Sequence, residues 1–123
     1  MYELKYHIVW VLKYRRAILD EPVASALKRI FKGTAERYGF EIVEQAVMPD
    51  HVHLFVSAPP RFSPALIANH LKGYSSRFLR KKYPHLKKLY GKEHLWTSSY
   101  YVGTAGNISA ETIRRYIVEC PAK

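Results

Sequence analysis

The sequence predicts an α+β protein: an antiparallel four-stranded sheet with two helices on one face, followed by a further helix at the C-terminal end. Two observations predict this class. Runs of β-branched and aromatic residues alternate with segments of helical periodicity in the order β-α-β-β-α-β-α. The second and third strands are separated only by a short turn, so they form a hairpin and are antiparallel. With 123 residues, the chain is expected to form one domain, residues 1–123.

The first strand is predicted at residues 6–12, where aromatic and β-branched residues are consecutive. A helix is predicted to begin after Asp20, a favourable N-cap with Pro22 in the first turn, and to end at Gly39. Apolar side chains on this helix recur at helical spacing and should face the sheet: Val23, Leu27, Ile30, Phe31 and Ala35.

The hairpin is predicted at residues 41–47 and 51–58, with Pro49 and Asp50 in its turn and Pro59-Pro60 after its second strand. Ser63 and Pro64 have the composition of a helix start, so a second long helix should follow. Its predicted buried stripe consists of Leu66, Ile67, His70, Leu71, Tyr74 and Phe78.

The remaining chain is predicted to form a surface loop at residues 85–93 and a fourth strand at 96–102. A glycine-containing break at 103–107 then leads to a last helix at 109–119, which Pro121 ends. The first six elements match a ferredoxin-like (RRM-like) βαββαβ arrangement, which hosts many nucleic-acid binders but does not by itself define a function.

The net charge of +10, from 20 Lys and Arg against 10 Asp and Glu, favours a polyanionic partner. Nucleic acid is the first candidate, an anionic membrane is the second, and a merely soluble basic protein is the alternative. Cys120 is the only cysteine, so neither an intrachain disulfide nor a CxxC zinc knuckle is possible. We expect no membrane-spanning segment and no signal peptide, and therefore a reducing, cytoplasmic setting.

Two histidines, His51 and His53, begin the third strand at positions i and i+2. Side chains in a strand alternate between faces, so both rings should point to the same side and could chelate a metal ion. The alternative is a pair of hydrogen-bonded or half-exposed histidines with no ligand role.

Tyr116 is predicted to lie near the end of the last helix, next to Arg114 and Arg115 and four residues before Cys120. A tyrosine in this setting could attack a phosphate if a metal ion and the arginines stabilise the negative charge. The alternative is a packing residue, because the chain has 10 tyrosines.

The whole chain resembles the small single-tyrosine transposases of the HUH superfamily, the TnpA-type enzymes of insertion sequences and of REP-associated elements. HUH denotes histidine, a bulky hydrophobic residue and histidine, and His51-Val52-His53 fits this pattern. The other matching blocks are YHIVWV at residues 6–11, KYRR at 13–16, MPDHVHL at 48–54, Lys72-Gly73, LWTSSY at 95–100, Ala105-Gly106-Asn107 and Tyr116-Ile117.

The resemblance implies a single-stranded DNA transposase that cleaves and rejoins DNA at insertion-sequence ends through a 5′-phosphotyrosine intermediate. It makes His51 and His53 ligands of a divalent metal, magnesium or manganese, and Tyr116 the nucleophile. It further implies a homodimer that recognises DNA hairpins near the element ends and needs neither a nucleotide cofactor nor a membrane.

Cys120 departs from the family pattern, which commonly has a glutamine four residues after the tyrosine as a third metal ligand. A thiol is a softer ligand and must lose its proton to bind well. Three possibilities stay open: Cys120 ligates the metal, it has no role, or it marks a weakened copy of the enzyme.

Basic residues are predicted to contact DNA around the first strand's exit and along the second helix, where Tyr74 and Tyr83 lie among them. Trp96 is either a stacking platform or a core residue, and His7 and His70 are expected to be core histidines rather than ligands. The competing interpretation of the chain is a non-catalytic ferredoxin-like nucleic-acid-binding module. The predicted DNA-binding residues are Lys13, Arg15, Arg16, Lys72, Arg77, Arg80, Lys81 and Lys82.

Overall fold

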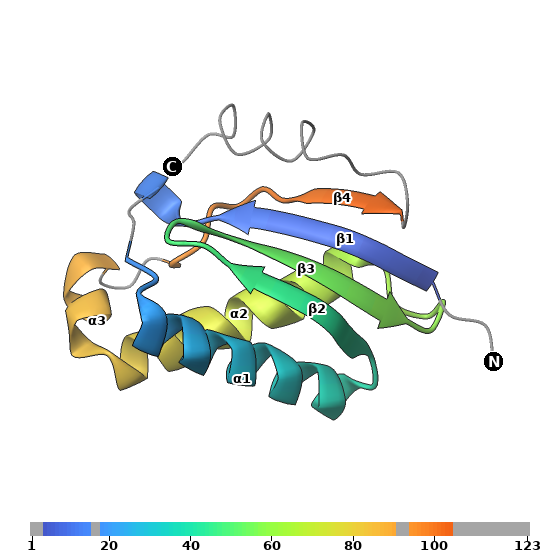
Figure 1. The fold of residues 1–123 in the computed structure, drawn as a ribbon, viewed down its shortest axis with the longest axis horizontal. Coiled ribbons are helices and arrows are strands. Elements are labelled where there is room, and N and C mark those ends of the chain that lie inside the picture. The colour runs from blue at the N-terminus through green and yellow to red at the C-terminus, as the bar shows by residue number, and fades with distance from the viewer. Residues whose placement is uncertain (1–3, 16–17, 91–93, 105–123) are drawn as a thin grey trace.

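The computed structural model describes residues 4–15, 18–90 and 94–104. Its four strands form one antiparallel sheet in the order β2-β3-β1-β4, and two long helices cover one face of it (Figure 1). This order confirms the predicted ferredoxin-like arrangement. The last helix, predicted at 109–119, lies outside the described residues. The strands are β1 (Leu4–Val11), β2 (Glu41–Val47), β3 (His51–Ala58) and β4 (Tyr101–Thr104).

The two central strands, β1 and β3, place alternate side chains on opposite faces of the sheet. Val11 is opposite His51 and His7 is opposite Phe55 in their antiparallel register. The core lies between the sheet and the helices, and the faces are set by the two-residue period of each strand. Fully buried residues of these strands in that core are Ile8, Trp10, Val52, Leu54, Val56 and Ala58.

Helix α1 (Glu21–Tyr38) begins and ends where the sequence predicts. The side chain of Asp20 accepts a hydrogen bond from the backbone N–H of Val23 at 3.1 Å. Gly39 ends the helix with a φ of 92°, a left-handed conformation that glycine adopts without steric cost. Val23, Leu27, Phe31 and Ala35 are buried against the sheet, and Ile30 is partly buried.

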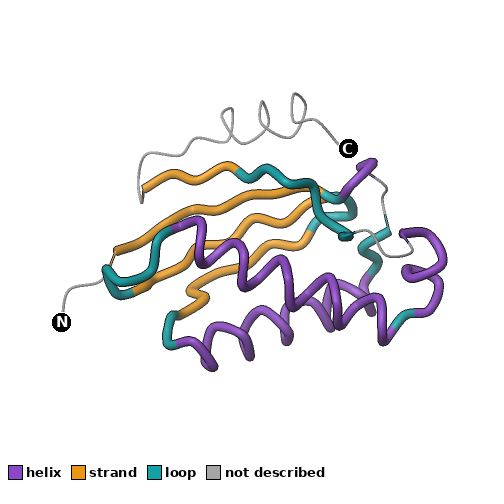
Figure 2. The backbone as a smooth tube through the Cα atoms, turned by 180° about the vertical axis from the view of Figure 1, so that it is seen from behind, coloured by secondary structure: helices purple, strands orange, loops and turns teal. Residues whose placement is uncertain are grey.

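Helix α2 (Pro64–Lys82) is capped by Ser63, as predicted, but the predicted buried stripe is partly wrong. Phe78 and Leu66 are 48% and 40% exposed, whereas Ser75 and Ser76 are fully buried. The two serines face inward because their hydroxyl groups bond to a neighbouring segment: Leu95 N–H donates to Ser76 Oγ at 3.0 Å. Figure 2 shows both long helices on the same side of the sheet.

Helix α3 (Pro84–Tyr90) replaces part of the surface loop predicted at 85–93, so that prediction is wrong. Pro84 stands in its first turn, and Leu86 and Tyr90, four residues apart, are both buried. The hydroxyl of Tyr90 donates to the carbonyl oxygen of Lys13 at 2.9 Å. Helix α3 thereby supports the short 3-10 turn η1 (Lys13–Arg15), which follows β1.

Strand β4 begins later than predicted. Residue Trp96 forms only an isolated bridge with Leu12, and the regular pairing with β1 begins at Tyr101. Gly103, expected to start the break at 103–107, lies within β4 opposite His7. The rest of that predicted break lies outside the described residues.

Candidate active site and nucleic-acid interface

His51 and His53 lie on the same face of the sheet, as predicted. The side chain between them, Val52, is fully buried in the core, and so is Leu54 after them. Strand alternation therefore turns both imidazoles to the face that neither α1 nor α2 covers. Both histidines are half-buried, so each ring is held by protein on one side and open on the other.

The ring of His51 is held by the residue before it. Its Nδ1 lies 2.8 Å from Oδ1 of Asp50. An ionised carboxylate can only accept, so Nδ1 carries the hydrogen, and in the neutral form of the ring Nε2 has the lone pair. This is the arrangement that orients metal-binding histidines in proteins, with a carboxylate behind the ring.

The ring of His53 contacts His7, which was expected to be a core histidine. The structure instead places His7 on the open face, with its Nδ1 3.1 Å from Nε2 of His53. Burial lowers the pKa of His53 below its ordinary value of 6.5, and the nearby His7 and His51 lower it further. A neutral imidazole is the form that binds metals.

A shallow cavity of about 260 Å³ adjoins His53 on this face and is lined by His7, Glu44, Gln45, Ala46 and Phe55 as well. Among residues 4–15, 18–90 and 94–104, no three His, Cys, Asp or Glu side chains are grouped as a metal site. The described residues thus supply two histidines, and further ligands must come from elsewhere. Cys120 and Tyr116 lie outside the described residues.

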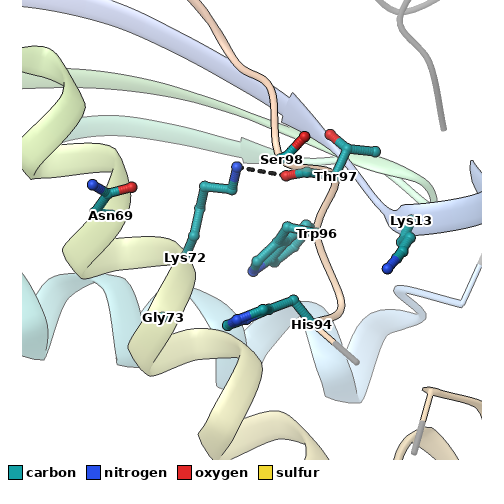
Figure 3. Close-up of a pocket in the computed structure, with 8 residues that line it drawn as sticks. All are labelled: Lys13, Asn69, Lys72, Gly73, His94, Trp96, Thr97 and Ser98. Carbon is teal, nitrogen blue, oxygen red and sulfur yellow. Dashed lines mark hydrogen bonds between the residues drawn. The ribbon is translucent and has the colours of Figure 1, made fainter. Parts of the chain in front are cut away.

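Lys72, a predicted DNA contact, has a structural partner. Its ammonium donates to the carbonyl oxygens of Thr97 at 2.6 Å and Ser99 at 3.3 Å, as Figure 3 shows for Thr97. Arg80 similarly donates from Nε to the carbonyl oxygen of Ser76 at 3.2 Å. These contacts hold backbone segments in place.

The other predicted DNA contacts differ in their exposure. Arg77, Lys81 and Lys82 are exposed on α2, as a phosphate contact requires. Lys13 is half-buried and lines a cavity of about 500 Å³ beside α2, together with His94, Trp96 and Lys72 (Figure 3). The side chain of Arg15, and the whole of Arg16, lie outside what the structure describes.

Trp96 is a core residue rather than a stacking platform. It is 2% exposed, its Nε1 donates to Ser75 Oγ at 2.8 Å, and its ring meets Trp10 edge-on. His70 is half-buried and stacks on Tyr38 with ring centroids 3.8 Å apart. It lies between the two helices and not beside His53.

A cluster of aromatic and basic side chains between α1 and α2 was not predicted as a unit. Tyr38 and Tyr74 share a hydrogen bond of 3.0 Å, and Arg37 and Arg77 each lie 5.7 Å from the ring centre of Tyr74. The hydrogen bond from Tyr38 and the charge of Arg37 lower the pKa of Tyr74. Each of these residues was visible in the sequence, but their grouping depends on how the helices pack.

A family model described as IS200-like transposase matches residues 1–120 of the chain. The chain belongs to the IS200-like transposase family. The matched range includes His51, His53 and Tyr116, together with the other sequence blocks on which the resemblance rested.

Two curated relatives carry transposase names. The chain is 38% identical over 117 residues to the ISDra2 transposase TnpA of Deinococcus radiodurans, covering 95% of this chain and 84% of the relative. It is 34% identical over 113 residues to the transposase for insertion sequence element IS200 of Salmonella typhimurium, covering 92% and 74%.

Two solved structures share the fold of this IS200-like transposase. A crystal structure of a Deinococcus radiodurans R1 protein described as a transposase matches with a TM-score of 0.88 and 38% identity, covering 96% of this chain and 91% of that chain. A REP-associated tyrosine transposase bound to a REP hairpin matches with a TM-score of 0.59 and 15% identity, covering 93% and 62%, and shows the fold alone. In the described part of this chain, none of the helices is long and apolar enough to cross a membrane.

Proposed function

We propose that this IS200-like transposase cleaves and rejoins single-stranded DNA at insertion-sequence ends through a 5′-phosphotyrosine intermediate. One observation supports this proposal above the others. His51 and His53 sit side by side on a sheet face that α1 and α2 leave open, and both rings are anchored from behind. A purely structural strand has no evident use for two such imidazoles, because each polar ring needs a partner before it can be half-buried without cost in free energy.

His51 and His53 suit a divalent metal, magnesium or manganese, as two of its ligands. Asp50 leaves Nε2 of His51 available, and the lowered pKa of His53 favours its neutral form. A bound divalent metal would draw charge from the phosphate oxygens of the substrate. Cys120 is proposed as a third ligand only for metals that accept a thiolate.

Tyr116 is the proposed nucleophile. Its phenolic oxygen forms a bond to the phosphorus of one DNA phosphodiester while the bond to the 3′ oxygen breaks, and that oxygen leaves as a 3′-hydroxyl after taking a proton. The phenol must lose a proton, although its ordinary pKa is about 10. Arg114 and Arg115 precede it in the sequence, and we propose that their positive charges favour the anion. Attack of a 3′-hydroxyl on the phosphotyrosine rejoins DNA without ATP.

The proposed partner is single-stranded DNA that carries a hairpin, and the proposed assembly is a homodimer. The chain's net charge of +10 and the exposed Arg77, Lys81 and Lys82 of α2 suit a polyanion. A protein of the same fold is described as bound to a REP hairpin.

Covalent capture tests the proposal. The probe is a pool of 3′-fluorescent single strands, each with a short hairpin flanked by randomised arms, incubated with the protein and Mn²⁺ or Mg²⁺. A 5′-phosphotyrosine keeps the 3′ label, so the protein should acquire fluorescence that survives denaturing electrophoresis. Sequencing of the captured strands would give the cleavage site.

Two variants make the test specific. Tyr116→Phe should abolish the adduct and leave DNA binding within about threefold, since one hydroxyl contributes only about 1 kcal/mol. Tyr101→Phe, the matched control on β4, should retain the adduct. If Tyr101→Phe loses the adduct and Tyr116→Phe keeps it, Tyr116 is not the nucleophile. DNA binding with no adduct under any metal condition would favour the non-catalytic module or a weakened copy.

A further inference from the structure

His7 and His53 face each other across the two central strands of the sheet. Val9 is the residue directly opposite His53, and Phe55 is directly opposite His7, so the two histidines are diagonal neighbours. Diagonal side chains on one face of an antiparallel pair are within reach of long or aromatic groups. In this structure the two rings are in direct contact: Nδ1 of His7 lies 3.1 Å from Nε2 of His53.

The ring of His7 is fixed independently of His53. It stacks on Phe55 with ring centroids 4.6 Å apart and planes 18° from parallel. On its other side the opposite residue is Gly103 of β4, which has no side chain to displace it. His7 therefore presents Nδ1 from a defined position, and the tilted contact with His53 has a centroid distance of 5.2 Å.

The direction of this hydrogen bond decides what His53 can bind. A neutral imidazole has one N–H and one lone pair. If Nε2 of His53 accepts from His7, the hydrogen of His53 is on Nδ1 and neither nitrogen can ligate a metal. If Nε2–H of His53 donates to Nδ1 of His7, the lone pair of His53 is on Nδ1 and remains available.

We propose that His7 is a positioning residue for the metal site: it accepts the Nε2–H of His53, fixes that tautomer and holds the ring so that Nδ1 is the ligating atom. This inference rests on the proposed function, which makes His53 a ligand. His7 then does for His53 what Asp50 does for His51. Metal-binding histidines in proteins almost always donate their second N–H to such an acceptor.

The hydrogen bond can be observed directly in the metal-free protein, without any substitution. In protein with ¹⁵N-labelled histidine, NMR should find the hydrogen on Nε2 of His53, with a scalar coupling across the bond to Nδ1 of His7. A hydrogen on Nδ1 of His7 that points to His53, or no coupling between the rings, would overturn the proposal.

Matched variants test the effect on metal binding, with Mn²⁺ alone as the probe and calorimetry as the readout. His7→Phe keeps an aromatic ring on Phe55 but removes the acceptor, and should weaken Mn²⁺ binding by about 10- to 100-fold. His7→Asn places an amide oxygen near the Nδ1 position and should restore affinity to within about threefold of the wild type. His70→Phe, at a half-buried histidine that stacks on Tyr38 between the two helices, should leave the Mn²⁺ affinity unchanged.

The outcomes separate the two proposals. Unchanged Mn²⁺ affinity in His7→Phe means that His7 only packs. Equal losses in His7→Phe and His7→Asn mean that His7 needs its own imidazole, as a ligand does, and the positioning role is wrong. If neither the wild type nor His51→Ala binds Mn²⁺, the metal-assisted function fails. The scalar coupling measured by NMR between His53 and His7 still shows the direction of their hydrogen bond in that case.

Discussion

The ammonium of Lys72 lies 2.6 Å from the carbonyl oxygen of Thr97, which joins α2 to the segment before β4. Ser75 and Ser76, on the next turn of α2, accept from Trp96 and Leu95 of the same segment. Three polar side chains of one helix thus bind a stretch of chain that is also hydrogen-bonded through its backbone to Val11 and Lys13. These bonds hold the segment that leads into β4, while β4 itself lies beside His7 through its pairing with β1.

Lys72→Met should lower the free energy of unfolding by about 1.5–3 kcal/mol, because a charged donor bonded to backbone carbonyls is lost and the carbonyls are left without it. Arg77→Met, one turn further along the helix at an exposed position, should change stability by less than about 0.5 kcal/mol. Urea denaturation of both variants measures the difference. Equal stability of the two variants would show that the Lys72 bonds carry no net free energy.

Arg77 should contribute to DNA binding where Lys72 does not. Arg77→Gln should reduce the slope of log affinity against log salt by about one unit, because one phosphate contact is removed. Fluorescence anisotropy with a hairpin-bearing single strand, measured over a range of salt concentrations, gives this slope. Lys72→Met is the control and should keep the wild-type slope. The reverse result would mean that Lys72 leaves its carbonyl partners to bind DNA.

Local chemistry made the helix starts predictable. Asp20 and Ser63 were identified as caps from two or three neighbouring residues, and each makes the capping bond in the structure. Helix α3 was missed because its signal is weak: Pro84 at the start and only Leu86 and Tyr90 to bury, among lysines. Leu86 and Tyr90, at positions i and i+4, were the evidence for a helix in the sequence. A segment of seven residues is too short to show helical periodicity.

Contacts between distant segments could not be predicted in the same way. The alternation of side chains along β3 was enough to place His51 and His53 on one face. The approach of His7 to His53 depends on the register between strands 46 residues apart, which the sequence does not state. Likewise Ser75 and Ser76 are buried because the 95–96 segment reaches them, so a search for apolar periodicity selected Phe78 instead.

The metal-free protein should lose stability as the pH falls below about 6.5. Burial lowers the pKa of His53 in the folded state, whereas in the unfolded chain it has its ordinary value of 6.5. The unfolded state therefore binds more protons in this range, so the contribution is complete above pH 6.5 and is lost as the pH falls toward and below the folded value. Thermal denaturation between pH 7.5 and 5, with chelator present, measures it. His53→Phe should flatten this dependence, and a variant as pH-sensitive as the wild type would assign the effect to other groups.

Active sites should be shared between two copies of the chain, the histidines coming from one copy and Tyr116 from the other. β4 is an edge strand of the sheet, so its outer side can pair with a second copy across a two-fold axis. Gly106, which precedes the predicted last helix, permits the backbone change that would carry Tyr116 across. The simpler alternative is a monomer in which that glycine only makes a turn.

Complementation between two inactive variants tests this arrangement. His51→Ala/His53→Ala chains and Tyr116→Phe chains are each expected to form no adduct with the labelled single strands. After mixing and subunit exchange, half of the dimers should be mixed, and each should hold one complete site, so the adduct should return to about a quarter of the wild-type level. Sites built within one chain would give no recovery, because neither variant has both parts. A mixture that stays inactive although native mass spectrometry detects mixed dimers, or a chain that sediments as a monomer, would contradict the shared site.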